Sequence, residues 1–321
     1  MVTLKVWNLM KKLLLSTAIL SSLTSTTLFA ATVYDQDNTQ LKVGGRAEAR
    51  ANISDNNETT DNSSFKDKSR ARINLKGKTK INESLGAFGT YEVEIGSGKD
   101  NTVNTRYLFA GLSTTVGNFS YGQQDSAQVM LTDYTDILAT FGGDAADLTT
   151  GNKDKRENNF LYSGEFDALT VQANYIASNE KDDDSFGISG MYALPMGLDF
   201  GLGYTSGQQA STGLNSVDAD QINLAIRYTV NAFMVSGLFT TGEIDNKDAN
   251  GYELAAAYKL DQWVFQGVYN FQDVDSTDTE NNVAIEAIYK LNKSFRTYAG
   301  YKFEQIDNKD DQLQFGLRYD F

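Results

Sequence analysis

The chain has 321 residues with no cysteine, no histidine, one proline and 27 glycines, and its 42 acidic side chains outnumber 28 basic ones. The absence of cysteine excludes disulfides and thiol chemistry, and the absence of histidine removes the usual general base and a common metal ligand. The net charge of −14 argues against a nucleic-acid partner, because binding to the phosphate backbone requires clustered Lys and Arg.

Residues 1–30 have the pattern of a secretory signal peptide. Lys11-Lys12 precedes an apolar run at 13–20, and a cleavage motif ends near residue 31. We expect cleavage after Ala30, with cleavage after Ala31 as the alternative because the residue three positions before the cut is bulky. Met10 is the more natural start, so residues 1–9 are interpreted as an upstream extension. Residues 31–321 are then one barrel domain.

From Leu41 onward, apolar and polar side chains alternate in sixteen segments of about 8 to 12 residues, the length that a tilted strand needs to cross a bilayer. No segment of the mature part approaches the roughly 20 consecutive apolar residues of a transmembrane helix. The pattern predicts an all-β fold, a 16-stranded antiparallel transmembrane β-barrel. Its clearest face comprises Ile222, Leu224, Ile226, Tyr228 and Val230.

Short and long connections alternate along the second half. Residues 231–232, 261–262 and 292–294 are predicted tight turns, whereas 244–249, 274–280 and 306–310 are predicted longer acidic loops. A soluble β-sandwich is the alternative, but it would leave many aromatic side chains on one uncovered face. The aromatic side chains near the short turns are predicted to form a girdle at the membrane interface: Tyr228, Phe233, Tyr258, Trp263, Tyr289, Phe295, Tyr319 and Phe321.

The last nine residues, Leu313–Phe321, alternate large apolar with polar or small side chains and end on an aromatic. An even number of strands places both ends of the barrel at one rim. This last strand should therefore pair with Leu41–Asn52 and leave no open edge.

One segment breaks the alternation. More than thirty residues between Gln123 and Asn158 show no sustained period of two, and loops of that length are usually functional or disordered. The segment combines apolar side chains with aspartates, so it can fold into the aqueous hole that sixteen strands leave. An ordinary surface loop is the alternative.

Basic side chains cluster on the predicted lumen side of the first strands. A basic row opposite an acidic loop would create a transverse field that orients polar solutes. The alternative is that these residues lie at the rims or pair with Glu92, Glu94 and Asp67. The row comprises Lys42, Arg46, Arg50, Arg70, Arg72, Lys76, Lys78, Lys80 and Arg106.

Several motifs resemble the general diffusion porins of Gram-negative outer membranes, of the trimeric enterobacterial and vibrio type. They are Ala31-Thr-Val-Tyr-Asp, Ala71-Arg-Ile-Asn-Leu-Lys-Gly, Thr105-Arg-Tyr-Leu-Phe-Ala-Gly-Leu, Phe119-Ser-Tyr-Gly, Tyr134-Thr-Asp-Ile-Leu, Phe141-Gly-Gly-Asp and the terminal Phe321. The resemblance implies a homotrimer in the cell outer membrane, in contact with lipid and lipopolysaccharide. It also implies an inward-folded third loop, and a terminal strand with Tyr319 and Phe321 that the barrel-assembly machinery recognises.

The resemblance assigns Arg46, Arg72 and Arg106 to the basic side of a constriction and Asp136 to its acidic loop. Thr140 stands where many relatives have glutamate, so Thr140→Glu should increase cation selectivity. A fourth family arginine has no clean match, and Lys153, Lys155 and Arg156 are the nearby candidates. The full predicted constriction comprises Asp133, Asp136, Thr140, Asp144 and Asp147 on the loop and Arg46, Arg72, Lys76, Arg106 and Arg156 opposite it.

We therefore predict a passive, water-filled channel for small hydrophilic solutes, with weak cation preference and without cofactor or metal. An outer-membrane hydrolase is disfavoured because histidine is absent and no serine or acid pair has catalytic spacing. A solute-specific, oligosaccharide-type porin is the closer alternative. It would need successive aromatics along the lumen, whereas inward aromatics such as Phe88 and Tyr298 are scattered.

Overall fold

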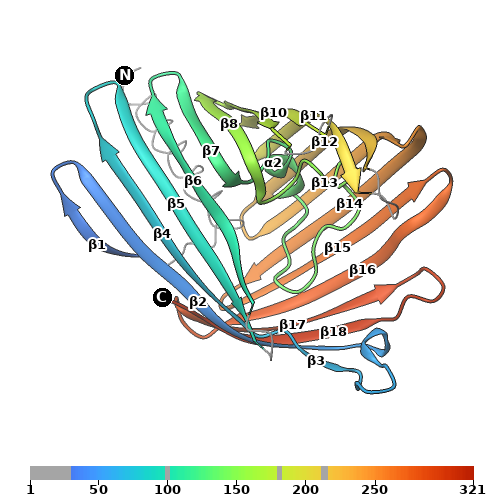
Figure 1. Ribbon diagram of the computed structural model, residues 1–321. Helices are drawn as coiled ribbons and strands as arrows, with labels where there is room; N and C mark the ends of the chain where they lie inside the picture. Colours follow the sequence, from blue (N-terminus) through green and yellow to red (C-terminus); the bar gives the residue numbers. More distant parts are fainter. Residues whose placement is uncertain (1–29, 98–101, 179–182, 211–215) are drawn as a thin grey trace, which may run out of the picture.

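A computed structural model describes residues 30–97, 102–178, 183–210 and 216–321. The predicted signal peptide and upstream extension lie outside the described residues, apart from Ala30. The described part is one continuous antiparallel sheet that closes into a barrel (Figure 1). No described helix has both the length and the apolar character needed to span a membrane.

Sixteen strands form the closed ring, as the alternation predicted, and each is antiparallel to both neighbours. In chain order they are β2 (Thr39–Ile53), β4 (Arg70–Lys80), β5 (Leu85–Gly96), β6 (Val103–Thr114), β7 (Gly117–Gln124), β8 (Arg156–Phe166), β9 (Leu169–Ile176), β10 (Ser185–Leu194), β11 (Leu198–Ala210), β12 (Ser216–Val230), β13 (Phe233–Ile244), β14 (Lys247–Leu260), β15 (Trp263–Val274), β16 (Thr277–Lys290), β17 (Phe295–Glu304) and β18 (Gln312–Asp320).

Four short elements complete the described chain. Strand β1 (Ala31–Gln36) pairs with the first residues of β2, and β3 (Phe65–Asp67) pairs with the last. A 3-10 turn, η1 (Asp55–Asn57), follows β2. The helix α2 (Val129–Thr132) lies in the connection between β7 and β8.

The period of two separates an apolar outer face from a polar inner face. On β14, Leu254 is 61% exposed whereas its neighbour Glu253 is 1% exposed. No part of the described chain packs over the large apolar residues of the outer face. In a membrane barrel, lipid contacts this face instead. This arrangement confirms the predicted alternation.

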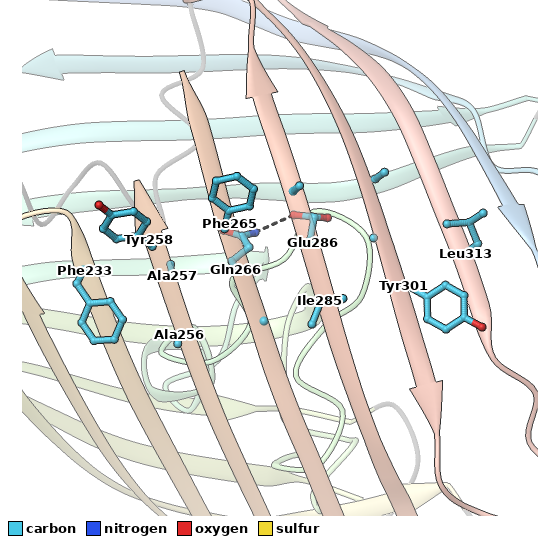
Figure 2. A pocket seen from close by; sticks show the side chains of 14 residues that line it. Phe233, Ala256, Ala257, Tyr258, Phe265, Gln266, Ile285, Glu286, Tyr301 and Leu313 are labelled. Carbon is cyan, nitrogen blue, oxygen red and sulfur yellow. Dashed lines mark hydrogen bonds between the residues drawn. The ribbon is translucent and has the colours of Figure 1, made fainter. Parts of the chain in front are cut away.

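An apolar hollow of about 540 Å³ lies on the outer face of β13 to β18. Figure 2 shows the rings of Phe233, Tyr258 and Phe265 around it, together with Gln266, which donates a hydrogen bond to Glu286 (2.8 Å). Its outward floor consists of small residues in neighbouring strands: Ala256, Gly267, Ala287 and Ala299.

The predictions of long loops at 244–249 and 274–280 are wrong. Residues 245–246 and 275–276 are two-residue turns, and the strands continue into both predicted loops. Asp245 and Asn246 adopt positive φ (53° and 58°), which suits a tight hairpin turn. The alternation does not extend to these strand ends, because a strand that extends beyond the bilayer is in contact with water on both faces. The connection after Glu304 is a loop, as predicted.

The barrel closes where β18 pairs with β2, from Leu313 opposite Ile53 to Asp320 opposite Arg46. This pairing was predicted from the alternation. The main chains of Gly45 and Phe321 then exchange two hydrogen bonds, of 2.8 and 3.0 Å. Strand β1 pairs with the earlier part of β2, so β1 and β18 pair with successive parts of the same edge of β2.

The close contact at Gly45 generates a prediction. A Cβ at Gly45 would overlap the Arg72 main-chain oxygen and lie 2.7 Å from the Phe321 ring, whereas a Cβ at Gly77 would meet no atom within 4 Å. We expect Gly45→Ala to destabilise the barrel by about 1–3 kcal/mol through overpacking, and Gly77→Ala to have little effect. Unfolding temperature, followed by heat-dependent gel mobility in detergent, measures both. Equal temperatures for the two variants would contradict this account of closure.

Candidate functional site

The connection between β7 and β8, residues 125–155, packs against the inner face of the barrel. Its apolar residues join three clusters of inward-facing side chains, the third of which receives only Ala139. Leu131 and Tyr134 contact Ala225 and Leu238, and Phe141 contacts residues of β14 to β16. Figure 1 shows α2 and the rest of this connection within the ring of strands. The apolar part of the segment is thus buried against the wall.

Glu253 of β14 binds the main chain of this segment. Its carboxylate accepts hydrogen bonds from the N–H groups of Ala145 (2.8 Å) and Ala146 (2.9 Å) and from the hydroxyl of Thr135. A buried carboxylate is stable only when such donors replace water. Glu253 therefore fixes the segment at two separate places.

Other wall side chains act in the same way, mostly on main-chain groups. Together with Glu253, these side chains come from five different strands, so the segment is attached around much of the wall. Gln221 accepts from the N–H groups of Leu148 (2.8 Å) and Thr149 (2.7 Å), Glu286 accepts from Ala139 N–H (2.9 Å), Asn270 accepts from Asp144 N–H (3.2 Å), Gln266 donates to the Ile137 oxygen (2.7 Å), and Arg50 donates to the Thr140 oxygen (2.5 Å).

An acidic cavity of about 620 Å³ borders the segment. It brings together four of the predicted loop residues with Asp125 and Glu280. The two lysines that border it are Lys153 and Lys155, and the four predicted residues are Asp133, Asp136, Asp144 and Asp147. No group of three or more acidic side chains in the described chain has the geometry to hold a metal ion.

The protein around this cavity raises the pKa of its aspartates. Desolvation, with repulsion from Asp125 and Asp136, raises the pKa of Asp133 to about 7. Desolvation raises the pKa of Asp136 to about 6, although a hydrogen bond from the Gly143 main chain opposes the rise. Both carboxylates are exposed to the lumen, and contact with water moderates these shifts.

Asp144 and Asp147 are also raised in pKa by desolvation, and each has a cation nearby that opposes the rise. Lys302 Nζ lies 3.7 Å from Asp144, and Lys153 Nζ lies 3.8 Å from Asp147. These two aspartates therefore belong partly to ion pairs, unlike Asp133.

The arginine wall is the charged inner surface formed by Arg46 of β2, Arg70 and Arg72 of β4, and Arg106 of β6. Arg72 donates to Glu94 (2.5 Å) and Arg106 donates to Glu92 (2.8 Å), so the pairing suggested as an alternative from the sequence is present for these two. Arg106 is the extra residue of a β-bulge, because Glu92 lies opposite Tyr107 and Val93 opposite Thr105. Asp67 makes different contacts, with Ser69 and Ser97.

Thr140 does not face open lumen. It is 7% exposed, and a Cβ placed on Gly300 would collide with its hydroxyl. Its main-chain oxygen binds Arg50. A glutamate at 140 would enter this contact with β17, so the increase in cation selectivity expected for Thr140→Glu does not follow from this geometry.

Two predicted basic residues lie apart from the arginine cluster. Lys76 is exposed on β4, directly opposite Lys42. Arg156 is exposed at the start of β8, and Lys155 borders the acidic cavity instead. Burial, followed by repulsion from Arg106, lowers the pKa of Lys155, which places this lysine near the basic wall.

Glu253 and Gln221 are functional residues that sequence reasoning did not assign. Glu253 lies at an inward position of the alternating pattern, but two of its partners are main-chain N–H groups 107 and 108 residues away in the chain. A main-chain donor carries no sequence signature. The only available signal was a carboxylate at an inward position.

A closed barrel of sixteen strands with an apolar exterior, a charged interior and an internal segment defines a transmembrane channel of the porin class. Residues 16–311 match the family described as Gram-negative porin, and the chain belongs to that family. It is a porin of the outer membrane that allows passive diffusion.

A curated relative and solved structures agree with this assignment. Porin-like protein L of Photobacterium profundum is 38% identical over 97% of this chain and 100% of its own length. Salmonella typhi OmpF, solved in complex with daunomycin, superimposes with a TM-score of 0.79 at 20% identity, covering 91% of this chain and 100% of that one. The trimer form of Vibrio cholerae OmpT gives 0.70 at 18% identity, with 89% and 100% covered. These two structures show the same fold.

The attachment of the segment by Glu253 can be tested by substitution. Glu253→Ala removes the acceptor of two main-chain N–H groups, and a buried donor left without a partner costs about 1–3 kcal/mol. We expect more frequent closures and a broader spread of open conductance in single-channel recordings. Glu253→Gln keeps an acceptor oxygen and should behave closer to the parent. If Glu253→Ala closes no more often than the parent channel and has the same spread of open conductance, Glu253 is dispensable for attachment.

Proposed function

We propose that the narrowest part of the diffusion path lies between segment 125–155 and the arginine wall, and that the path weakly prefers cations. The observation that carries this proposal is the acidic cavity beside the segment. The segment contains six aspartates and two lysines, and the wall arginines are largely paired with carboxylates. Mobile cations are therefore attracted on one side more strongly than anions on the other.

The transported solutes are small and hydrophilic, and the channel carries out no catalysis and binds no cofactor. Support comes from the polar lumen and the absence of histidine and cysteine from the sequence. An oligosaccharide-specific channel has less support. The inward rings of Tyr134 and Tyr298 are 1% and 3% exposed, so neither offers a face on which a sugar could stack. Micromolar block by maltooligosaccharides or chitooligosaccharides would favour that alternative.

The assembly is a homotrimer, packed through the outer face of β2 and β4 to β6. That face carries small side chains, including Ala47, Ala49, Ala71, Ala87 and Ala110, which permit close approach of a second subunit. Vibrio cholerae OmpT, which has the same fold, was solved as a trimer. Outer-membrane lipid and lipopolysaccharide contact the remaining outer surface.

The signal peptide of residues 1–30 is removed on export, and the barrel-assembly machinery recognises the terminal strand through Tyr319 and Phe321. Both rings are exposed on the outer face and stack with centroids 6.2 Å apart. Deletion of Phe321 should lower the amount of inserted protein more than the conductance of each channel. Membrane fractionation and single-channel recording measure the two effects. Normal membrane levels of the truncated protein would argue against this role.

The raised pKa values of Asp133 and Asp136 predict pH-dependent selectivity. A carboxyl group with a raised pKa holds its proton to a higher pH, so these two groups lose their charge at a higher pH than ordinary aspartates when the solution is acidified. Cation preference should therefore be present at pH 8 and decline as the pH falls below about 7. Reversal potentials across a KCl gradient measure this change.

Matched variants identify the groups responsible. The double variant Asp133→Asn with Asp136→Asn should be less cation-selective at pH 8 and lose most of the pH dependence. Asp167→Asn is the control, because Asp167 lies in the turn between β8 and β9 at positive φ, which asparagine tolerates. A parent channel that prefers anions at pH 8 would refute the proposed selectivity.

A further inference from the structure

The wall opposite the acidic segment places like charges side by side. Arg46 of β2 lies directly opposite Arg72 of β4, and like charges in such cross-strand positions repel. Arg70 is two residues from Arg72, on the same face of β4, and Arg106 approaches from β6. Such an arrangement needs counter-charges, and the wall supplies its own.

Three glutamates alternate with these four arginines. Each arginine has a carboxylate oxygen within 4 Å, and each of the three carboxylates contacts at least two arginines. Glu48 lies 2.5 Å from Arg70 and 3.6 Å from Arg46, Glu94 lies 2.5 Å from Arg72, 3.5 Å from Arg70 and 3.8 Å from Arg106, and Glu92 lies 2.8 Å from Arg106 and 3.9 Å from Arg72.

The three glutamates differ in their access to the lumen. The side chain of Glu48 is 1% exposed and also accepts a hydrogen bond from the hydroxyl of Tyr298 (2.7 Å), so it is integrated into the wall. Glu92 is 9% exposed. Glu94 is 21% exposed and is the only one of the three that contacts three of the arginines. Its charge therefore has the greatest effect on what a passing ion meets.

We propose that Glu94 is a selectivity-determining residue of this channel, acting by cancelling the arginine charge that faces the acidic segment. The inference rests on the proposed cation preference and identifies a residue on the basic wall that sustains it. With Glu94 ionised, the cluster of four arginines and three glutamates carries one surplus positive charge. Without that charge, the surplus doubles, and Arg72 and Arg106 attract anions more strongly.

The test is Glu94→Gln, which keeps the shape and an acceptor oxygen for Arg72 while removing the charge. We expect the reversal potential in a KCl gradient at pH 8 to move toward the chloride equilibrium potential. Added citrate should also reduce the current through this variant more than through the parent, since exposed guanidinium groups bind carboxylates. A reversal potential equal to the parent's would overturn the proposal.

Two further variants separate charge from folding. Glu83→Gln removes the same charge from a glutamate that pairs with Lys80 in the turn after β4 and is 95% exposed, and it should leave selectivity unchanged. Arg72→Gln should shift the reversal potential in the opposite direction, toward the potassium equilibrium potential. This second readout still decides the matter if Glu94→Gln fails to assemble, because an unchanged Arg72→Gln channel would mean that wall charge does not set selectivity.

The outcomes distinguish this inference from the function on which it rests. An anion-selective parent channel contradicts the proposed function itself. A cation-selective parent with an unaltered Glu94→Gln variant contradicts only the role of Glu94, and would leave that glutamate as a structural partner of Arg72.

Discussion

The structure depends first on the closure of its main-chain hydrogen bonds. Hydrocarbon offers no partner to a free N–H or C=O group, so a sheet can cross a bilayer only when its first and last strands pair. Here β18 pairs with β2, and Phe321 extends the pairing to Gly45. Closure of sixteen strands leaves an interior too wide for side chains alone to fill. The chain therefore uses one of its own connections to occupy part of that space.

Polar contacts do in this interior what a hydrophobic core does in a soluble domain. Small apolar clusters around Leu131 and Phe141 hold parts of segment 125–155, but its course is fixed by wall side chains that bind its main chain. On the opposite wall, guanidinium and carboxylate groups neutralise one another. Both arrangements are costly to disturb, because a buried polar group without a partner loses its hydration and gains nothing in return.

Local periodicity carried most of the fold and part of the site. Strands such as Phe233–Ile244 and the pairing of the last strand followed from alternation, because a membrane wall has one apolar face. The hairpin at 245–246 was missed because its strands leave the bilayer, where that contrast disappears. Thr140 was placed by resemblance, which gives a position in the chain but no side-chain direction. Glu253 was not assigned because two of its three partners are main-chain N–H groups, which leave no signal in the sequence.

The anchoring of segment 125–155 has a consequence for how such channels diversify. Gln221 and Glu253 bind N–H groups that every residue except proline supplies. The side chains of the segment that face the lumen can therefore be exchanged over generations while its path through the lumen is retained. Shape and charge become separately heritable, so a lineage can adapt permeability to a new habitat by a few substitutions on an inherited scaffold.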